Sequence, residues 1–373
     1  MSGMLRVMTV LGTRPEIIRL SRVISLLDSI ADHVLVHTGQ NSAENLSAVF
    51  FRDLGVRTPD LFLSVDTSSI GRQLGSLFER FEQALDEYRP DRVLILGDTN
   101  SALVAYNCKR RGIPVYHMEA GNRCFDDRVP EEVNRRVIDH CSSVLLPYTE
   151  RSAENLVREG IERHRIFVTG NPINEVLTSY MPLIDASDAL VAHKVEPMQY
   201  LLATMHRAEN VDNDVTFASL CRALAQVAND RAMPLILSVH PRIRTKVTAE
   251  LFEGTRVVAV DALPFAAFVR LERDAALVLT DSGTVQEECA ILRTPVITIR
   301  DSTERPETIE AGSNIISSTR PEDIRRAARY LNSAVATPDW CAPEGYMARN
   351  VADKVVRIIL SDPAWASAWH TRS

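Results

Sequence analysis

The sequence has few cysteines, and their spacing does not indicate a metal site or a disulfide framework. Six cysteines occur among 373 residues, and no two of them form a C-x-x-C pair. Such pairs are typical of structural metal sites and redox centres, so no metal is expected, and scattered thiols fit a reducing cytoplasm. The positions are Cys108, Cys124, Cys141, Cys221, Cys289 and Cys341.

The chain also lacks a basic block, a long apolar run and the layout of a signal peptide. Its net charge is −7, so nucleic acid is not expected as a partner. No apolar run reaches the roughly 20 residues that span a bilayer. Residues 4–11 read as a strand that runs straight into Gly12, not as a signal peptide. We therefore expect a cytoplasmic protein with no membrane span.

What is present in the first half is an alternation of short β-branched runs with helical patterns. This alternation is typical of βαβ units and a parallel sheet. The expected strands are 5–11, 33–38, 92–96, 114–118, 143–146 and 166–169. The expected helices are 17–29, 43–54, 70–88, 101–111, 132–140 and 150–159. Ser101 is expected to cap one helix at its start, and Gly112 to close it.

A second series of the same kind follows a weaker stretch. The expected strands are 200–204, 235–239, 256–260, 277–279 and 295–299, and the expected helices are 216–228, 264–273, 285–292, 321–331 and 347–360. We expect an α/β protein whose two Rossmann-like domains face a cleft suited to a small molecule. The domains are residues 1–172 and 173–345, with 173–197 as a connector, followed by a helix and tail at 346–373.

The turn after the first strand lacks the G-x-G-x-x-G dinucleotide fingerprint. It reads GTRPE at 12–16, where Gly12 allows a tight turn and Arg14 offers a guanidinium to a phosphate at a helix start. The alternative is a plain βα turn, with Pro15 at the first helical position and Glu16 favouring the helix dipole. That alternative leaves Arg14 unexplained.

A second helix start, after the strand at 277–279, reads DSGTVQEE at 281–288. Ser282, Gly283 and Thr284 are placed to hold a diphosphate, and Glu288 could accept hydrogen bonds from ribose hydroxyls. The alternative is a well-capped helix with Asp281 or Ser282 as its cap. That alternative does not account for Glu288.

Three carboxylates are the strongest chemical signal in the chain. Asp98 and Glu119 each follow a strand, and Glu131 stands just before a helix. Acidic groups at carboxyl strand ends are placed to move protons, because burial and like charge raise a carboxylate's pKa toward neutrality. Structural alternatives remain for two of them. Asp98 fits a Gly-Asp turn, and Glu131 fits an acidic first helical turn after Pro130.

Two histidines and one arginine complete the set of candidates. His206 could contact a phosphate or protonate a leaving group, and His240 follows another strand in a similar way. A lone histidine after a strand is more often structural. Arg305 belongs to a charged run at 300–307, which is either a solvated loop or a charged edge of the site.

Together these motifs resemble the non-hydrolysing UDP-N-acetylglucosamine 2-epimerase family. The resemblance covers nearly the whole chain and rests on GTRPE at 12–16, GDT at 97–99, EAG at 119–121, PEExNR at 130–135, HRxEN at 206–210, DSG at 281–283 and ERPE at 304–307. It implies a glycosyltransferase-B-like fold with UDP in the cleft, a C-terminal helix crossing back to the first domain, and a homodimer. It implies catalytic roles for Asp98, Glu119, Glu131 and His206, and nucleotide or substrate contacts for Arg14, Arg19, Arg135, His240, Ser282, Gly283, Thr284, Glu288 and Arg305.

The chain departs from the family pattern at three places. Arg19 stands where a lysine is usual, which replaces a compact ammonium with a planar guanidinium. Thr284 stands where a second glycine is common. The segment at 118–132 resembles the branch that converts UDP-2-acetamido-2,6-dideoxy-L-talose to UDP-N-acetyl-L-fucosamine for surface polysaccharides; the main alternative is a UDP-N-acetylglucosamine/UDP-N-acetylmannosamine 2-epimerase.

The chemistry expected from these residues is elimination and re-addition. The C2 hydrogen of a sugar nucleotide is not acidic, and nothing in the sequence suggests a nicotinamide or another cofactor that would make it so. Asp98 and Glu131 are the expected acid and base on the two faces of C2. A retaining UDP-sugar glycosyltransferase and a non-catalytic nucleotide-sugar-binding protein are the competing interpretations.

Overall fold

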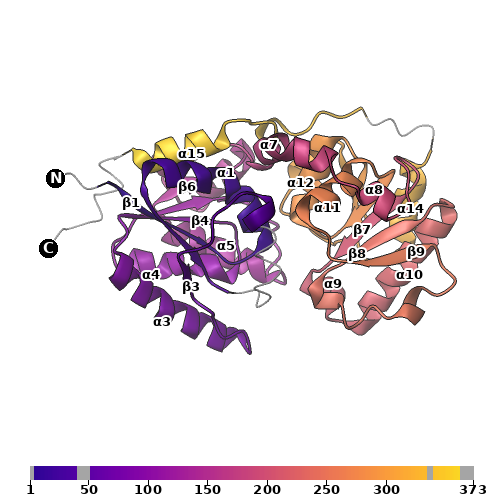
Figure 1. The fold of residues 1–373 in the computed structure, drawn as a ribbon, viewed down its shortest axis with the longest axis horizontal. Helices are drawn as coiled ribbons and strands as arrows, with labels where there is room; N and C mark the ends of the chain where they lie inside the picture. The colour runs from indigo at the N-terminus through magenta and orange to yellow at the C-terminus, as the bar shows by residue number, and fades with distance from the viewer. Residues whose placement is uncertain (1–3, 40–50, 334–338, 362–373) are drawn as a thin grey trace. The chain divides into compact units, whose positions relative to one another are not determined.

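In the computed structural model the chain forms two α/β units, each built on one parallel sheet (Figure 1). The structure describes residues 4–39, 51–333 and 339–361. Unit 1 comprises the residues up to Val176 together with those from Glu344 onward, and unit 2 comprises Leu177–Pro343. The prediction of two Rossmann-like parallel sheets is confirmed.

Unit 1 contains a six-stranded parallel sheet in the order β3-β2-β1-β4-β5-β6. Its strands are β1 (Arg6–Leu11), β2 (Asp32–His37), β3 (Leu61–Phe62), β4 (Arg92–Leu96), β5 (Val115–Met118) and β6 (Val144–Leu146). Its helices are α1 (Arg14–Ile30), α3 (Ile70–Tyr88), α4 (Ala105–Arg110), α5 (Pro130–Cys141), α6 (Glu150–Arg158) and α15 (Val351–Leu360). Short 3-10 turns lie at Asn100–Val104, Arg163–Arg165 and Glu344–Tyr346.

Unit 2 contains a second six-stranded parallel sheet, in the order β12-β11-β10-β7-β8-β9. Its strands are β7 (Leu201–Met205), β8 (Leu235–Val239), β9 (Val257–Asp261), β10 (Leu277–Thr280), β11 (Val296–Thr298) and β12 (Asn314–Ile316). Its helices are α8 (Ala189–Ala192), α9 (Ala208–Val211), α10 (Asp214–Asp230), α11 (Phe265–Arg273), α12 (Gly283–Leu292), α13 (Pro306–Glu310) and α14 (Pro321–Leu331), and 3-10 turns lie at Pro241–Ile243 and Ala249–Phe252. Helix α7 (Ile173–Asp185) leads from unit 1 into unit 2.

Both sheets follow the same winding scheme. Counted from the first strand of each unit, the spatial order is 3-2-1-4-5-6, which is that of the Rossmann fold. The winding direction reverses between β1 and β4 in unit 1 and between β7 and β10 in unit 2. Open α/β sheets bind their ligands outside the carboxyl ends of the strands at such a switch point. The topology alone therefore marks one candidate site in each unit.

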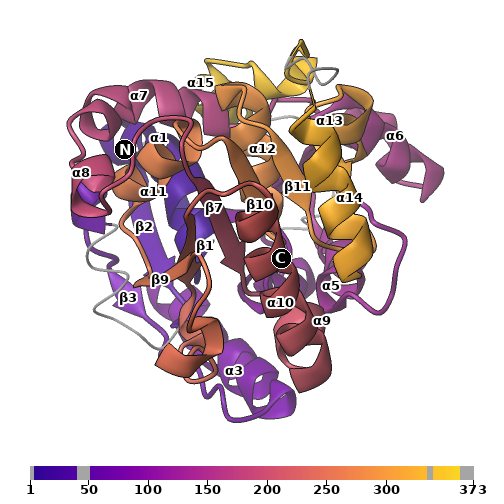
Figure 2. The ribbon, with the colours of Figure 1, turned by 90° about the vertical axis from the view of Figure 1, so that its right-hand side faces the viewer.

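The central strands are apolar along their length because helices cover both faces of each sheet. In unit 2, Leu201 and Ala203 of β7 belong to a core that includes residues of α10 and α14. Tyr200 and Leu202 point to the other face, into a core that includes residues of α11 and α12. Side chains of a strand alternate between faces, so four successive residues supply both cores. Figure 2 shows α10 and α14 side by side.

The C-terminal segment returns to unit 1. Helix α15 packs along α1, as Figure 1 shows. The backbone N–H of Asn171 donates to the Gly345 carbonyl at 2.8 Å, and the Asn174 amide donates to the Met347 carbonyl at 3.0 Å. The Lys354 ammonium donates to the Thr169 carbonyl at 3.2 Å. These contacts confirm that the C-terminal helix crosses back to the first domain.

Some expected elements differ in the structure. The run at 166–169 is not a strand: Ile166 makes one isolated bridge to Leu145 of β6. Most of the expected helix 43–54 lies outside the described residues. In the part that the structure describes, residues 51–53 are helical. The expected connector 173–197 is largely helical, since it contains α7 and α8. The expected helix 101–111 begins as a 3-10 turn before α4.

The two expected capping residues of that helix have different outcomes. Ser101 does not cap it. Its hydroxyl lies 2.7 Å from the Thr38 hydroxyl, and both lie beside Gly12. Thr99 precedes the 3-10 turn instead. Gly112 closes α4 as predicted, with a φ of 68° and its N–H donating to the Lys109 carbonyl at 3.2 Å.

A pair of glycines tests the packing of the C-terminal segment on unit 1. Gly170 and Gly160 have φ values of 91° and 87°, but a Cβ on Gly170 would lie 2.5 Å from that of Ala348, whereas one on Gly160 meets nothing within 4 Å. We expect Gly160→Ala to lower the free energy of unfolding by about 1–2 kcal/mol through backbone strain alone. Gly170→Ala should cost about 1–3 kcal/mol more, because the chain around Ala348 must move. Urea denaturation measures both, and equal losses would contradict this packing.

Candidate functional site

The predicted residues of unit 1 lie at the carboxyl edge of its sheet. Gly12 follows β1, and Asp98 comes two residues after the end of β4, so both flank the switch point. Glu119 directly follows β5, and Glu131 is in the first turn of α5. The remaining members, Arg14, Arg19 and Arg135, lie on α1 and α5.

Asp98 is held by a forked ion pair with Arg135. The carboxylate oxygen Oδ2 of Asp98 lies 2.8 Å from Arg135 Nε and 2.7 Å from Nη2. The Asn134 amide donates to the Asp98 backbone carbonyl at 2.9 Å, so α5 fixes both the main chain and the side chain. The Asp98 side chain is 18% exposed, whereas that of Arg135 is 2% exposed. Asp98 is therefore an oriented carboxylate that a ligand can still reach.

Glu119 occupies a strained position in the same edge. Its φ is 68°, a left-handed conformation that is uncommon for a residue other than glycine. Its carboxylate oxygen Oε2 forms a buried ion pair with Arg19 of α1 and accepts from the Tyr148 hydroxyl at 3.4 Å. The Asn122 amide donates to Oε1 at 3.4 Å. Strain of this kind persists where surrounding contacts over-determine the geometry, which is common at functional sites.

Glu131 and Glu132 are neighbours with different environments. Pro130 begins α5, as the sequence predicts, and both acids lie in its first turn. Glu132 is fully buried, whereas Glu131 is half-buried. Glu131 is therefore the member of the pair that solvent and a ligand can reach.

A buried histidine joins the segments that carry these carboxylates. His117 of β5 is 1% exposed; its Nε2 lies 2.8 Å from the Gly97 carbonyl and its Nδ1 lies 2.8 Å from Asp139 Oδ1. The ring thus bridges a main-chain carbonyl and a buried carboxylate. His117 thereby fixes the residue before Asp98, and it lies on β5, which Glu119 directly follows.

Asp139 anchors the other side of this histidine. It is fully buried on α5 and also accepts from the Arg123 guanidinium at 2.7 Å and the Gly121 N–H at 3.2 Å. Burial opposes its ionisation, but the bonds from His117 and Arg123 prevail and lower the pKa of Asp139. The sequence analysis missed both His117 and Asp139. The H-x-E spacing at 117–119, at the end of the predicted strand 114–118, is the signal that points to His117.

The turn after β1 requires glycine at position 12 because two hydroxyl groups approach it closely. A Cβ on Gly12 would lie 2.2 Å from the Ser101 hydroxyl oxygen and 2.3 Å from that of Thr38, so only glycine fits. Glu16 lies in the first turn of α1, where the helix-dipole interpretation places it. It is buried, and its carboxylate accepts from the Gly12 N–H at 2.6 Å and from the Thr99 hydroxyl at 2.6 Å. Arg14, the first residue of α1, is half-buried, and burial lowers its pKa.

Glu16 makes the stability of unit 1 depend on pH. Burial raises the pKa of Glu16 from 4.5 to about 7, against the opposing effect of its hydrogen bonds. Because the folded pKa exceeds the unfolded one, the stability this group contributes is present below the unfolded pKa and is lost as pH rises to 7. We expect the free energy of unfolding of wild type, measured by urea denaturation, to fall by up to about 3 kcal/mol relative to that of Glu16→Gln between about pH 5 and pH 8. Parallel pH profiles for the two proteins would refute this.

In unit 2, His206 and Asp281 flank the second switch point, just past the carboxyl ends of β7 and β10. His206 Nδ1 lies 3.1 Å from Asp281 Oδ1. Asp281 also accepts from the backbone N–H groups of His206 and Arg207 at 3.0 Å and from the Asn210 amide at 3.1 Å. Burial opposes ionisation of Asp281, but these contacts lower its pKa. The alternative that Asp281 is a helix cap is therefore wrong: it orients His206.

His240 lies beside His206. Their ring centroids are 5.1 Å apart with an interplanar angle of 34°. The Nδ1 of His240 accepts from the Arg242 backbone N–H at 3.2 Å, which fixes the tautomer with the hydrogen on Nε2. The structure thus brings two predicted histidines together at one edge of the unit 2 sheet.

The start of α12 presents main-chain amides beside a buried arginine. Ser282 is the N-cap by position, but its side chain makes no capping bond, so the expected capping role is not seen. Gly283 and Thr284 form the first turn, whose amides precede the first intrahelical bond. A Cβ on Gly283 would lie 2.6 Å from Arg305 Nη1, which explains the glycine.

Arg305 lies in a buried ion-pair network, so the charged run at 300–307 is not a solvated loop. Its Nε donates to Glu287 Oε1 at 2.7 Å, and its Nη1 pairs with Glu304. Glu304 also accepts from Arg300 at 2.9 Å and from Arg207 at 3.2 Å. The network fixes the guanidinium of Arg305 against the start of α12.

Glu288 contacts a second buried carboxyl group that the sequence analysis missed. Glu288 is 4% exposed, and Glu272 of α11 is fully buried. Burial and the neighbouring Glu288 raise the pKa of Glu272 well above its ordinary value. The Glu272 side chain also hydrogen-bonds with Glu288. The Cys289 thiol donates to Glu272 Oε1 at 3.2 Å.

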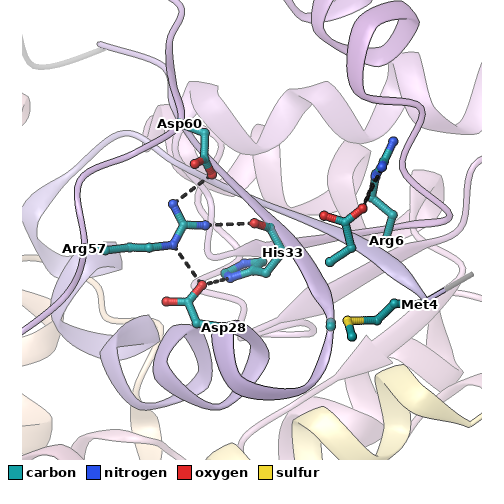
Figure 3. Close-up of a pocket in the computed structure, with 8 residues that line it drawn as sticks. Met4, Arg6, Asp28, His33, Arg57 and Asp60 are labelled. Atoms are coloured by element: carbon teal, nitrogen blue, oxygen red, sulfur yellow. Dashed lines mark hydrogen bonds and ion pairs between the residues drawn. The ribbon is translucent and has the colours of Figure 1, made fainter.

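A pocket of about 720 Å³ lies elsewhere, at the amino ends of β1 and β2 (Figure 3). Arg57 there donates to Asp28 at 2.9 Å and pairs with Asp60 at 2.8 Å. His33 Nδ1 lies 2.6 Å from Asp28. Ligands of open α/β sheets bind at the opposite edge, and these charges already pair with one another. We therefore do not include this pocket in the candidate site.

Over the described ranges, no group of three or more His, Cys, Asp and Glu side chains is arranged to hold a metal ion. Within the same part of the chain, every helix is too short or too polar to cross a membrane.

Comparison with known proteins shows an extended match. Residues 27–360 match the family model described as UDP-N-acetylglucosamine 2-epimerase. The chain is 36% identical to the UDP-N-acetylglucosamine 2-epimerase of Methanocaldococcus jannaschii, over 94% of this chain and 97% of the relative. It is 33% identical to the UDP-2,3-diacetamido-2,3-dideoxy-D-glucuronate 2-epimerase of Pseudomonas aeruginosa, over 87% and 92%. The crystal structure of the M. jannaschii protein in complex with UDP-GlcNAc and UDP superposes with a TM-score of 0.89 at 35% identity, over 95% and 99%.

Proposed function

The chain belongs to the UDP-N-acetylglucosamine 2-epimerase family, and on that premise we propose that it inverts C2 of a UDP-2-acetamido sugar by losing and recapturing UDP. The observation that carries this proposal is the pair of reachable carboxylates at the carboxyl edge of the unit 1 sheet. Asp98 is oriented by Arg135, and Glu131 is half-buried at the start of α5. Two carboxylates at one strand edge suit the removal of a proton and its return.

The proposed reaction is an anti elimination followed by re-addition. One carboxylate takes the C2 proton, a C1–C2 double bond forms, and the C1–O bond breaks with its electron pair going to UDP. The product of this step is a 2-acetamidoglycal. The other carboxylate then delivers a proton to the opposite face of C2 as UDP attacks C1. In the reverse direction Asp98 and Glu131 exchange roles, so both must be present for either direction.

We propose that unit 2 holds the nucleotide. The amides and hydroxyls at 282–284 suit the diphosphate, since a helix start favours an anion. His206, oriented by Asp281, would donate to the departing phosphate, with Arg14 adding charge from unit 1. Glu288 would accept hydrogen bonds from the ribose hydroxyls.

The remaining residues support these groups. We propose that Glu119, locked by Arg19 and Tyr148, positions the sugar beside Asp98. Arg135 would act through Asp98, and Arg305 through the α12 start that it covers. His240 would pack against His206. We further propose that the enzyme works without a cofactor, as a homodimer in the cytoplasm.

For the sugar we propose UDP-2-acetamido-2,6-dideoxy-L-talose, which would yield UDP-N-acetyl-L-fucosamine for surface polysaccharide synthesis. The segment from Met118 to Glu132 supports this choice, because it links Glu119 to Glu131 beside the proposed sugar site. UDP-N-acetylglucosamine is the second candidate, favoured by the name of the M. jannaschii relative. The P. aeruginosa relative carries the name of a third UDP-sugar, so the substrate varies within the family.

The carboxylate assignment predicts a separation of catalysis from binding. We expect Asp98→Asn and Glu131→Gln each to lower kcat by at least about a hundredfold, the contribution typical of acid–base catalysis. UDP binding by isothermal titration should stay within about threefold of wild type, because neither carboxylate is among the proposed nucleotide contacts. Turnover at the wild-type rate in both variants would contradict the assignment.

The elimination route predicts that C2 exchanges its hydrogen with solvent. Incubation of the purified enzyme with the UDP-sugar alone in D₂O should give product carrying deuterium at C2, read by ¹H NMR. Product without deuterium would argue for an oxidative route. Release of UDP only when an acceptor is added would identify a glycosyltransferase, and no change in the sugar would identify a binding protein.

A further inference from the structure

Phe125 is held in an unfavourable state on the loop that links Glu119 to Glu131. Its side chain is 70% exposed, and its φ is 54°. A bulky residue at positive φ is an outlier, because its Cβ crowds the backbone. An exposed aromatic ring also forgoes the free energy of burial. The fold therefore keeps Phe125 where neither its backbone nor its ring is at its most stable.

The buried Glu132 holds this conformation. Its two carboxylate oxygens accept from the backbone N–H groups of Cys124, at 3.0 Å, and of Phe125, at 3.1 Å. Glu132 is fully buried in the first turn of α5. A buried carboxylate with two main-chain donors has little freedom, so the loop is clamped directly at the strained residue.

The same clamp connects Phe125 to the proposed catalytic carboxylate. Glu132 Oε2 accepts from Arg135 Nη1 at 2.6 Å, and the other nitrogens of Arg135 hold Asp98. Only the side chains of Glu132 and Arg135 thus stand between the Phe125 amide and the Asp98 carboxylate. The Cys124 thiol also lies 3.8 Å from Arg135 Nη1. The backbone of Phe125 is therefore tied to the group that would act at C2.

We propose that Phe125 is a specificity-determining residue that selects a methyl group over a hydroxymethyl group at C6 of the sugar. The inference rests on the proposed function, because it takes the UDP-2-acetamido sugar to lie beside Asp98. The exposed ring would supply apolar surface beside the charged groups of this edge. The apolar part of a 6-deoxy sugar is the ligand group that such a surface accommodates.

The chemistry sets the size of the effect. A C6 hydroxyl placed against the Phe125 ring loses its hydrogen bond to water and finds no acceptor there. A hydrophobic surface rejects an analogue that adds one hydroxyl by about tenfold to a hundredfold. We therefore expect wild type to favour the 6-deoxy substrate by that factor in kcat/KM, and loss of the ring to remove most of the preference.

The test uses two substrates that differ only by the C6 oxygen. UDP-N-acetyl-L-fucosamine and UDP-N-acetyl-L-galactosamine form this pair, and C2 epimerisation of each is followed by NMR. Phe125→Gly removes the ring and accommodates the positive φ without strain, whereas Phe125→Ala removes the ring but keeps the Cβ. Phe125→Tyr retains an aromatic ring. Tyr330→Ala removes a ring that is 54% exposed on α14 and serves as the matched control.

The readout is kcat/KM for the 6-deoxy substrate divided by kcat/KM for the substrate that carries the C6 hydroxyl. We expect this ratio to fall about tenfold or more in Phe125→Gly and Phe125→Ala. The thermal stability of Phe125→Gly should be at or above that of wild type. Phe125→Tyr and Tyr330→Ala should keep the wild-type ratio. An unchanged ratio in Phe125→Gly overturns this inference while the proposed function stands. A change in sedimentation coefficient with an unchanged ratio overturns it too, and indicates a subunit contact. If wild type turns over neither substrate nor any UDP-2-acetamido sugar, the proposed function itself fails.

Discussion

The winding of two parallel sheets is the constraint on which the rest of the molecule depends. Parallel strands need right-handed crossovers, and in each unit these crossovers reverse direction once, at β1/β4 and at β7/β10. At that point two loops diverge at the carboxyl edge and leave room for a ligand. The residues that follow those four strands are the turn at Gly12, the turn at Asp98, His206 and Asp281. Chemistry is thus confined to two edges before any side chain is considered.

Charged groups at these edges are fixed before a substrate arrives. Arg135 holds Asp98, Arg19 holds Glu119, and Asp281 holds His206, each through a partner that is almost fully buried. Breaking a buried pair leaves an uncompensated charge, so these orientations are strongly maintained. Preorganised groups need little rearrangement as charge develops in a transition state. The same fold retains two unfavourable features close together in the sequence, the strained Glu119 and the exposed Phe125.

The sequence predicts the fold better than the contacts within the candidate site. Helix Ile70–Tyr88 has the bounds that its strong periodicity predicts, and the apolar runs at 92–96 and 235–239 are strands as expected. The run at 166–169 has the composition of a strand, but only one bridge to Leu145 forms. Asp281 was misjudged as a possible cap because its partner His206 lies 75 positions away. Glu272 had no local signal, since its contact with Glu288 exists only after α11 and α12 pack. His117 does have a local signal, since it stands near the end of the apolar run 114–118 and two positions before Glu119.

The central claim is that the bond between C1 and UDP breaks and re-forms during each inversion. The direct measurement uses a UDP-2-acetamido sugar with ¹⁸O in the oxygen that bridges C1 and the β-phosphorus, followed by ³¹P NMR during epimerisation. Once the bond breaks, the terminal oxygens of the β-phosphate become equivalent by rotation. We predict that the label moves into non-bridging positions of the recovered UDP-sugar as C2 inverts. Complete inversion with the label still in the bridge would contradict it.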